Sequence, residues 1–451
     1  MIQREAIREY AAGSLWVLPG ISALAALLVG FGVSHISVRP GSVLAPLAFQ
    51  GTADDARTLL SNITGTVVTV IALVLGLTVV ALQLSSTQFS PRLLRNFLRD
   101  RPNQVVLSVF VATFSYSAAG LYTVGLAAGG RTEEFPRLAV SVAILLLFAS
   151  LAMVVYFADH LAHSIQVDAI GKRVEQATLT VIHGRLGSVE ETAPTPPPWA
   201  LPLPAARSGY LQTAHPELLL PLANQHHLHI GLRIRVGEHI VAGTVLARMW
   251  TPTPNDPTPD IHVVSHVLDA AVRIGFERTL EQDASFGIRQ LVDMACKALS
   301  PAVNDPYTAV QAVDHLSVIF CALATRPLGD YVAEDSSGWG WVIVPGRRFG
   351  DYLATMCGLI RRYGSSEPTL SIALLRLLDN CASVLPDDPD RWAALDAQAD
   401  LILADATREI AQPADNLAVR AAAQDLKTTI TTHRPRPAPP TDSPTTPGDH
   451  P

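Results

Sequence analysis

The sequence lacks the motifs that usually reveal catalytic chemistry. It has no HExxH motif, no glycine-rich phosphate loop, no pair of metal-binding carboxylates and no nucleophile beside a base. Its cysteines lie far apart in the C-terminal half, without a CxxC pair or a metal-site spacing: Cys296, Cys321, Cys357 and Cys381. We expect reduced cytosolic thiols in helix cores. These absences predict a protein that is not an enzyme and that holds no cofactor and no metal.

A positive charge surplus is absent as well. The net charge is -7 and the isoelectric point is near 6.0, so no overall basic field favours nucleic acid as a partner. Apolar residues are abundant instead, at 49% of 451 residues with a mean hydropathy of +0.27. These values are high for a wholly soluble chain, and the excess lies in the first third.

Four long runs in this first third contain no charged residue: residues 11–33, 61–84, 105–128 and 138–157. As a helix with a rise of ~1.5 Å per residue, each can cross the ~30 Å hydrocarbon core of a bilayer. We therefore expect residues 1–158 to form a four-helix transmembrane region. The lack of charge in every span argues against a proton-coupled pump or an ion-coupled transporter.

A basic loop follows the second span and fixes the expected orientation. It carries Arg92, Arg95, Arg99 and Arg101, and the positive-inside rule places such a loop in the cytoplasm. Alternation of the spans then places both termini in the cytoplasm. Arg92, Arg95 and Arg99 also share one helical face, which suits anionic headgroups; a ring at a pore mouth is the alternative, and topology alone explains them equally well.

The second span has a polar or small face at helical spacing: Asn62, Thr66, Thr69, Gly76 and Gln83. Polar groups inside a span can line a water-filled path for ions. Small and hydroxyl-bearing residues also let transmembrane helices pack closely, so helix packing is the more ordinary explanation. Because four spans make a narrow bundle, a pore would require a homo-oligomer.

The rest of the chain is too polar to span a bilayer. We expect a connecting helix and a proline-rich linker in residues 159–206, then a small β unit with glycine turns in residues 207–252. Helical periodicity predicts a bundle over residues 261–430, and the proline-rich residues 431–451 predict a disordered tail. The predicted fold class is an integral membrane α-helical region of four transmembrane helices, followed by a cytosolic α+β region with a small β unit and an α-helical bundle.

Charged residues concentrate along one predicted helix of this bundle, residues 279–299. The series consists of Arg278, Glu281, Asp283, Arg289 and Asp293. We expect a network of ion pairs that joins helices or subunits. A ligand pocket formed by Arg289 with Asn304 and Asp305 is the alternative. Asp305 is also placed to cap the next helix, with Pro306 as its first residue.

Two histidines, His160 and His163, lie one helical turn apart at the inner end of the last span, beside Asp159. An ordinary polar helix end explains them best. Imidazoles near headgroups can also sense pH. A zinc site needs three or four ligands, and no further ligand is evident.

Several segments together resemble a known bacterial family. They are LTVVALQLSSTQFSPRLLRNFLRDRP, ADHLAHSIQ, SGYLQ with VGEHIVAGTVLARMW, and ERTLEQDASFGIRQLVDMACKALSPAVNDPYTAVQAVDHL. They are similar to the predicted membrane proteins called domain of unknown function 2254, over nearly the whole chain except the tail. The resemblance implies a four-span region and a cytoplasmic C-terminal domain in the bacterial inner membrane, and it implies no activity.

Three kinds of function remain open from the sequence. The first is an oligomeric ion channel or transport protein with a cytosolic regulatory domain, and the polar face of the second span favours it. The second is a membrane-anchored protein that binds a small ligand or acts as a scaffold without transport. The third is an enzyme at the inner leaflet. The expected partners are the lipid bilayer, further copies of the chain, and an ion or small ligand.

Overall fold

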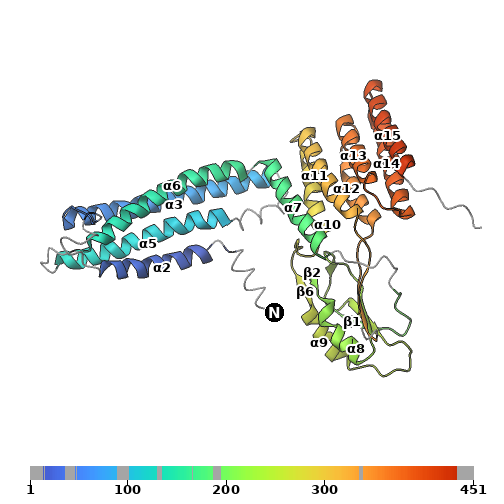
Figure 1. Ribbon diagram of the computed structural model, residues 1–451, viewed down its shortest axis with the longest axis horizontal. Coiled ribbons are helices and arrows are strands. Elements are labelled where there is room, and N and C mark those ends of the chain that lie inside the picture. The colour runs from blue at the N-terminus through green and yellow to red at the C-terminus, as the bar shows by residue number, and fades with distance from the viewer. Residues whose placement is uncertain are drawn as a thin grey trace, which may run out of the picture. The chain divides into compact units, whose positions relative to one another are not determined.

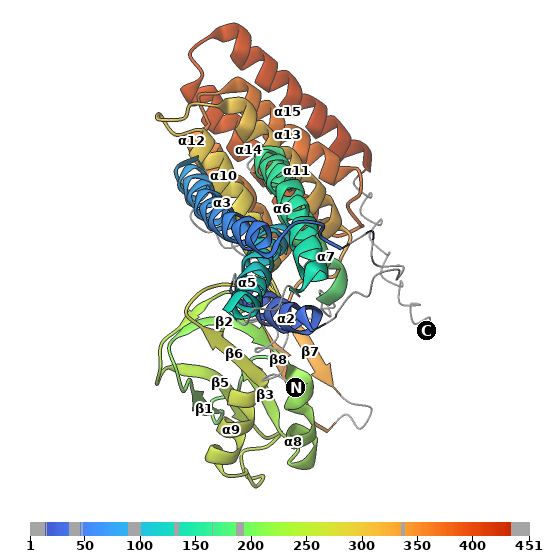
Figure 2. The same cartoon turned by 90° about the vertical axis from the view of Figure 1, so that its left-hand side faces the viewer.

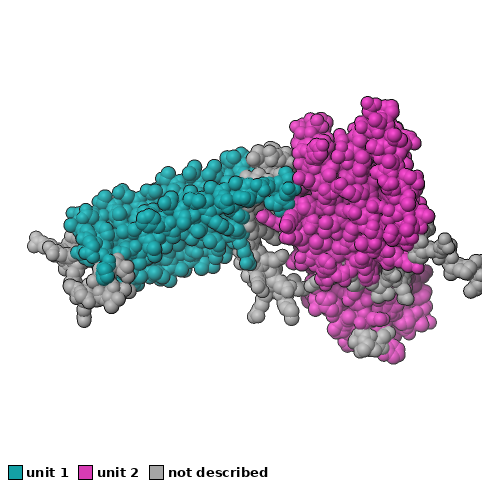
Figure 3. Space-filling view, turned by 45° about the horizontal axis from the view of Figure 1, so that its top comes forward, with its two compact units in different colours: residues 1–170 teal, residues 171–451 magenta. Residues whose placement is uncertain are grey.

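The structure is a computed structural model that describes residues 14, 16–35, 46, 48–88, 101–129, 135–164, 166–185, 194–334 and 339–433. Within these ranges it leaves the side chains of residues 84–88, 125–129, 164 and 185 undescribed. The chain divides into two compact units, residues 1–170 and residues 171–451 (Figure 3). We describe each unit by itself.

The first unit is built from long apolar helices (Figure 1). They are α2 (Val17–Ser34), α3 (Ala53–Gln88), α5 (Arg101–Gly129) and α6 (Arg137–Ser164). Helix α5 packs against each of the other three. All four are long and apolar enough to cross a membrane. A fifth described helix, Pro306–Ala324 in the second unit, meets the same criteria, so helix length and composition alone do not fix the number of spans at four.

Helix α3 begins earlier than the apolar run that predicted it. The Thr52 backbone N–H donates to the Asp55 carboxylate (2.9 Å), and the Asp55 N–H donates to the Thr52 hydroxyl (3.2 Å). This reciprocal pair is a capping box, which satisfies donors at a helix start. The polar first turns therefore join the helix. The connecting helix expected after the last span is divided, because α6 ends at Ser164 and α7 covers Val167–Arg185.

The second unit contains two sheets. The larger has the order β1-β5-β3-β8-β7 and the smaller has the order β4-β2-β6. The strands are β1 (Leu201–Pro204), β2 (Gly209–Ala214), β3 (His229–Leu232), β4 (His239–Ile240), β5 (Val245–Trp250), β6 (Val272–Gly275), β7 (Tyr331–Glu334) and β8 (Trp341–Val344). Neighbouring strands are antiparallel except β3 and β8, which are parallel.

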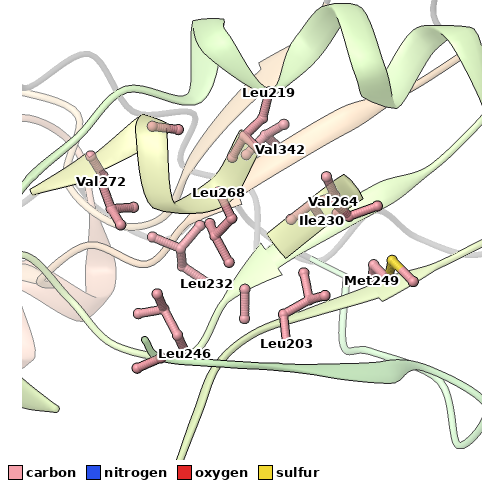
Figure 4. Close-up of a cluster of buried hydrophobic side chains, with 14 of the residues drawn as sticks. Leu203, Leu219, Ile230, Leu232, Leu246, Met249, Val264, Leu268, Val272 and Val342 are labelled. Carbon is pink, nitrogen blue, oxygen red and sulfur yellow. The ribbon is translucent and has the colours of Figure 1, made fainter. Parts of the chain in front are cut away.

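The core of this β region is aliphatic. Helices α8 (Leu220–Gln225) and α9 (Ile261–Ala271) contribute to it together with the strands, and the short helix η3 (Pro216–Leu218) precedes α8. Figure 4 shows the buried cluster, in which Leu268 of α9 lies among side chains of the sheets: Leu203, Ile230, Leu232, Leu246, Met249 and Val342. Burial of such side chains stabilises the fold by ~1.5–3 kcal/mol each.

Strands β6, β7 and β8 lie in the range 261–430, for which helices alone were expected. Each has only four residues, which is too short for a periodic signal. Their partner strands are also distant in the sequence, since β8 pairs with β3 and β6 pairs with β2. The β region is therefore assembled from more of the chain than residues 207–252.

The remaining helices are α10 (Ala284–Ala298), α11 (Pro306–Ala324), α12 (Phe349–Tyr363), α13 (Pro368–Ala382), α14 (Pro389–Glu409) and α15 (Pro413–His433). Asp283, Asp305, Glu367 and Asp388 cap α10, α11, α13 and α14, and each side chain accepts a backbone N–H of the first turn. Figures 1 and 2 both show α11–α15 at one end of the second unit and the sheets at the other.

Candidate functional site

A cleft of about 410 Å³ lies in the second unit, where the sheets meet the first turns of α10 and α12. Distant segments supply its walls: Ala214, Pro216 and Glu217; Arg235 and Val236; Gln282, Asp283 and Ala284; Gly329 and Tyr331; Val344, Pro345, Gly346 and Arg347; Tyr352; and Gly184 of α7. The volume is in the range of small-molecule sites, and the lining combines apolar walls with a few polar groups.

Asp283 is buried at the inner wall of the cleft. It caps α10 by accepting the Phe286 N–H (3.2 Å), and it accepts two bonds from the Arg278 guanidinium (2.9 and 2.7 Å). Gly237, at φ +89°, lies so close that a side chain there would overlap the Asp283 carboxylate. Burial raises the pKa of Asp283, and Arg278 opposes that shift. The carboxylate is thus already engaged within the fold.

Tyr352 on α12 is the most enclosed polar side chain of the cleft after Asp283, with 4% of its surface exposed. Its hydroxyl has no hydrogen-bond partner among the described residues, and its oxygen is not sealed from solvent. Burial, reinforced by the charge of Asp283, raises the pKa of Tyr352. The phenol therefore stays protonated and can donate a hydrogen bond into the cleft.

Arginines border this hydroxyl. Arg235 is paired with Asp351 (3.2 Å), whose carboxylate also accepts the Arg348 N–H (3.1 Å). Arg347 lines the cleft and makes no hydrogen bond or ion pair within the described part of the chain. Gln282 Oε1 accepts the Ala214 N–H (2.9 Å), so the carbonyl end of this side-chain amide is already engaged within the fold. The cleft thus contains one guanidinium and one hydroxyl that make no hydrogen bond within the described residues, while the charge of Arg347 favours the ionised form of Asp283.

The charged series predicted on one helix is only partly helical. Helix α10 begins at Ala284 because Asp283 is its cap, so Arg278 and Glu281 precede it. Arg278 pairs with Asp283, Glu281 pairs with Arg273, and Arg289 lies 3.7 Å from Asp293 one turn along α10. The series therefore separates into short-range pairs. Of these residues only Asp283 lines the cleft.

Asn304 and Asp305 lie in the turn between α10 and α11. Asn304 adopts φ +49°, and Asp305 accepts the Thr308 N–H (3.1 Å) as the cap of α11, as the sequence predicted. The Thr308 bonds lower the pKa of Asp305. Neither residue lines the cleft, and Arg289 does not line it either. Sequence reasoning missed Arg235, Arg347 and Tyr352 because they come from separate segments without a shared motif.

The polar face of α3 points away from the other helices of its unit. Asn62, Thr66, Thr69, Gly76 and Gln83 are all exposed, while Leu60, Ile63, Val67 and Val74 form the buried side. A methyl group added at Gly76 would meet nothing within 4 Å. The Thr69 hydroxyl donates to the Gly65 carbonyl of its own helix (3.0 Å). This face therefore makes no packing contact with the described helices of the unit.

The basic and histidine clusters receive little support as sites. Arg92, Arg95 and Arg99 lie outside the described residues, and Arg101 is the exposed first residue of α5. His163 contacts the Asp159 carbonyl (2.8 Å), and the His160 ring stacks on Tyr156 at 6.0 Å. Within the described ranges, no group of three or more His, Cys, Asp or Glu side chains is placed to hold a metal.

Two further sets of reactive side chains are buried. His229 lies among aromatic rings, with its centroid 4.1 Å from Trp341 and 5.8 Å from Trp250, and burial lowers its pKa to about 4. Burial raises the pKa of Cys296 to about 11 and that of Cys357 to about 12. Thiols with such pKa values stay protonated and are weak nucleophiles.

Comparisons with known proteins give a consistent family and no activity. The family model described as "Predicted membrane protein (DUF2254)" matches residues 12–380. Uncharacterised proteins of Mycobacterium bovis and Mycobacterium tuberculosis are 42% identical over 435 residues, which is 93% of this chain and 81% of each relative. No solved structure matches the chain. The chain therefore belongs to the family of predicted membrane proteins with domain of unknown function 2254.

Proposed function

We propose that this membrane protein binds a small molecule in the cleft of its second unit and that the helices of its first unit anchor it in the membrane. One observation carries the proposal: the enclosed Tyr352 lines the cleft, and its hydroxyl has no hydrogen-bond partner among the described residues. Solvent reaches the Tyr352 oxygen, so water can bond to this hydroxyl when no ligand is bound. A ligand that accepts the hydrogen bond replaces that water.

We further propose that α2, α3, α5 and α6 are the four spans. Helix α11 has sufficient length and composition, but Asp314 and His315 lie near its middle. Asp314 pairs with Arg376 of α13, and His315 Nδ1 lies 2.7 Å from Glu175 of α7. Helices α10 and α13 also pack against α11. Such ion pairs suit a water-soluble bundle better than a lipid-facing helix.

The proposed orientation follows the basic loop at residues 92–101, with both termini in the cytoplasm and the second unit on the cytoplasmic side of the inner membrane. In this proposal the cleft binds its ligand without turnover. No cysteine, serine or histidine is among the described residues that line the cleft, and Arg278 engages its buried carboxylate, Asp283.

The test is retention of small molecules by the full chain in detergent. The protein is equilibrated with a defined library of water-soluble metabolites, passed through a desalting column, and analysed by mass spectrometry. Glu217→Trp places a bulky side chain at the exposed rim of the cleft, and Glu334→Trp places the same side chain at an exposed position on β7 that does not line it.

We expect at least one compound that wild type and Glu334→Trp retain equally and that Glu217→Trp retains about tenfold less, a difference of roughly 1.4 kcal/mol. Equal retention by both variants, or retention of no compound by wild type, would contradict the proposal. The thermal unfolding temperature of each variant serves as the control for folding.

A second candidate, an oligomeric ion channel or transport protein, has one observation in its favour. The polar face of α3 is exposed on the first unit, and amides in a span usually seek a partner helix or water. Asn62 and Gln83 are 21 residues apart, so they lie ~31 Å apart along a helix and match the edges of the hydrocarbon core. Between Thr69 and Gln83 this face is apolar or small, which favours the anchoring role over a polar pore.

The channel candidate predicts a closed ring of three or more chains in detergent. It also predicts that Thr69→Leu and Gln83→Leu change ion flux in liposomes without loss of membrane insertion. A monomer, or wild-type liposomes without flux, would exclude a shared pore and leave the anchored binding protein.

A further inference from the structure

The acids around the cleft are already neutralised by the fold. Asp283 accepts two bonds from Arg278, and Asp351 pairs with Arg235. Glu217 is exposed at the rim, where its carboxylate lies 3.0 Å from the His215 ring. The fold therefore offers a cation little unpaired negative charge in the interior of the cleft. A buried cation without such a partner would be strongly destabilised.

The groups of the cleft that make no hydrogen bond within the described residues are donors, and the charge of one of them, Arg347, also acts on the Asp283 carboxylate. Arg347 has five N–H donors and no hydrogen-bond or ion-pair partner among the described residues. The Tyr352 hydroxyl likewise has no hydrogen-bond partner among them. Both belong to the segment that begins α12, and the first turn of this helix borders the cleft through Tyr352. A helix N-terminus adds positive potential to that of the guanidinium. The interior of the cleft therefore favours a hydrogen-bond acceptor that carries negative charge.

We infer that the cleft takes a small molecule with an oxyanion head, a carboxylate or a phosphate, which Arg347 and Tyr352 hold. Arginine binds both groups in a bidentate geometry, and the phenol supplies a third bond to a charged acceptor. This inference rests on the proposed binding function and names the chemical class of its ligand.

The apolar walls of the cleft indicate that the oxyanion head of the ligand is attached to an uncharged group. A volume of about 410 Å³ is larger than a bare anion needs, and Val236, Val344, Pro345 and Tyr331 form apolar wall. Tyr331 is partly exposed and presents an aromatic surface. A ring or short aliphatic body on the acid would remove this wall from water.

Three probes that share a phenyl ring and differ in the group attached to it test the inference: phenyl phosphate, benzoate and phenol. Each is titrated calorimetrically into the full chain in detergent at constant ionic strength. We expect heat of binding from phenyl phosphate or benzoate and at least tenfold weaker binding of phenol. The stronger of the two acids identifies the head as phosphate or carboxylate.

Two substitutions locate the head in the cleft. Arg347→Gln should weaken binding of the preferred acid by about 10- to 100-fold, and Tyr352→Phe by about tenfold, because both bonds go to a charged acceptor. Arg207→Gln, at an exposed arginine outside the cleft, should leave the affinity unchanged. Tyr352→Phe keeps the buried ring, and the unfolding temperature of each variant controls for folding.

Absence of heat with both acids, equal binding of phenol, or unchanged affinity in Arg347→Gln would overturn the oxyanion assignment. The metabolite experiment separates this failure from failure of the proposed function. A neutral compound whose retention is lost in Glu217→Trp would sustain the binding function and overturn only the oxyanion. Retention of no compound together with no heat would overturn both.

Discussion

The two units place polar and apolar residues in opposite ways. In the first unit many of the exposed side chains are apolar, among them Leu145, Phe148 and Val155, while hydroxyls such as Thr113 and Ser150 are buried. In the second unit, apolar residues such as Phe320 and Leu378 are buried, and exposed side chains form ion pairs such as Lys427 with Asp396 and Asp400. This difference is the one expected if the first unit meets lipid and the second meets water, as proposed above.

The driving forces differ accordingly. Water drives apolar side chains into the second unit, at about 25 cal/mol per Å² of buried apolar surface. Lipid gives no such drive, so helices in a bilayer associate through close packing and hydrogen bonds. The first unit has both: Gly30 of α2 lies against Ala119 of α5, and the Thr113 and Ser150 hydroxyls share a hydrogen bond of 2.9 Å.

The largest predicted effect comes from one substitution made in both units. Leu145 on α6 and Leu417 on α15 are each 68% exposed. Arginine near the middle of a span costs about 3 kcal/mol of insertion free energy relative to leucine, whereas a surface substitution in water usually changes stability by less than about 0.5 kcal/mol. Because the other spans would still hold the chain in the membrane, the readout is folded protein: we expect Leu145→Arg to reduce strongly the amount of folded protein recovered from the membrane and Leu417→Arg to leave it unchanged.

Similar behaviour of the two variants would contradict the proposed difference between the units. Full recovery of folded Leu145→Arg from the membrane would mean that this face of α6 meets water or another protein surface. Loss of folded protein in Leu417→Arg, measured as a lower unfolding temperature, would mean that α15 buries this leucine against a partner.

Sequence patterns predicted the helices better than the sheets. The apolar runs and the caps are local signals, and Asp305 followed by Pro306 begins α11 as predicted. Strands β7 and β8 have four residues each, and β8 joins β3 from far along the chain. Such pairing depends on tertiary packing that no local pattern encodes. The start of α10 was placed too early because the charged residues before Asp283 continue the helical spacing.

The cleft could be predicted only in part. Asp283 was named from the charged series, and its role as a cap explains why it lies at the wall. Arg235 follows β3, Arg347 follows β8 and Tyr352 lies in α12, so only the assembled fold brings them together. A single arginine or tyrosine has no distinctive spacing. The unpaired Tyr352 hydroxyl is a property of the packing and has no counterpart in the sequence.

A smaller effect tests a buried polar group in the second unit. His229 is neutral when folded because burial lowers its pKa to about 4, whereas an unfolded histidine titrates near 6.5. Between these values the unfolded state binds more protons, so the free energy of unfolding falls as the pH decreases from about 6.5 to 4. In wild type the free energy of unfolding should therefore decrease between pH 7 and pH 5. We expect this decrease to be smaller by about 1–2 kcal/mol in His229→Phe, after allowance for solvent screening.

Tryptophan fluorescence is a suitable measurement, because Trp250 and Trp341 adjoin His229. Urea unfolding curves at pH 7 and pH 5 give the change in the free energy of unfolding for wild type and for the variant. An identical pH dependence in both proteins would mean that the imidazole does not change its protonation state on unfolding. His227→Phe, at an exposed histidine next to Trp339, is the matched control.

The smallest effect concerns the buried hydroxyls of the first unit. Thr113→Val keeps the shape of the side chain and removes the bond to Ser150, and interhelical bonds of this kind contribute about 0.6 kcal/mol on average in a membrane protein. Thr69→Val is the matched control, since that hydroxyl is exposed and bonds only to its own helix. Thermal unfolding in detergent should therefore show a small decrease for Thr113→Val and none for Thr69→Val. The reverse order would show that the exposed face of α3 packs against another helix in the assembled protein, because only a contact outside the described unit could give Thr69 the larger contribution.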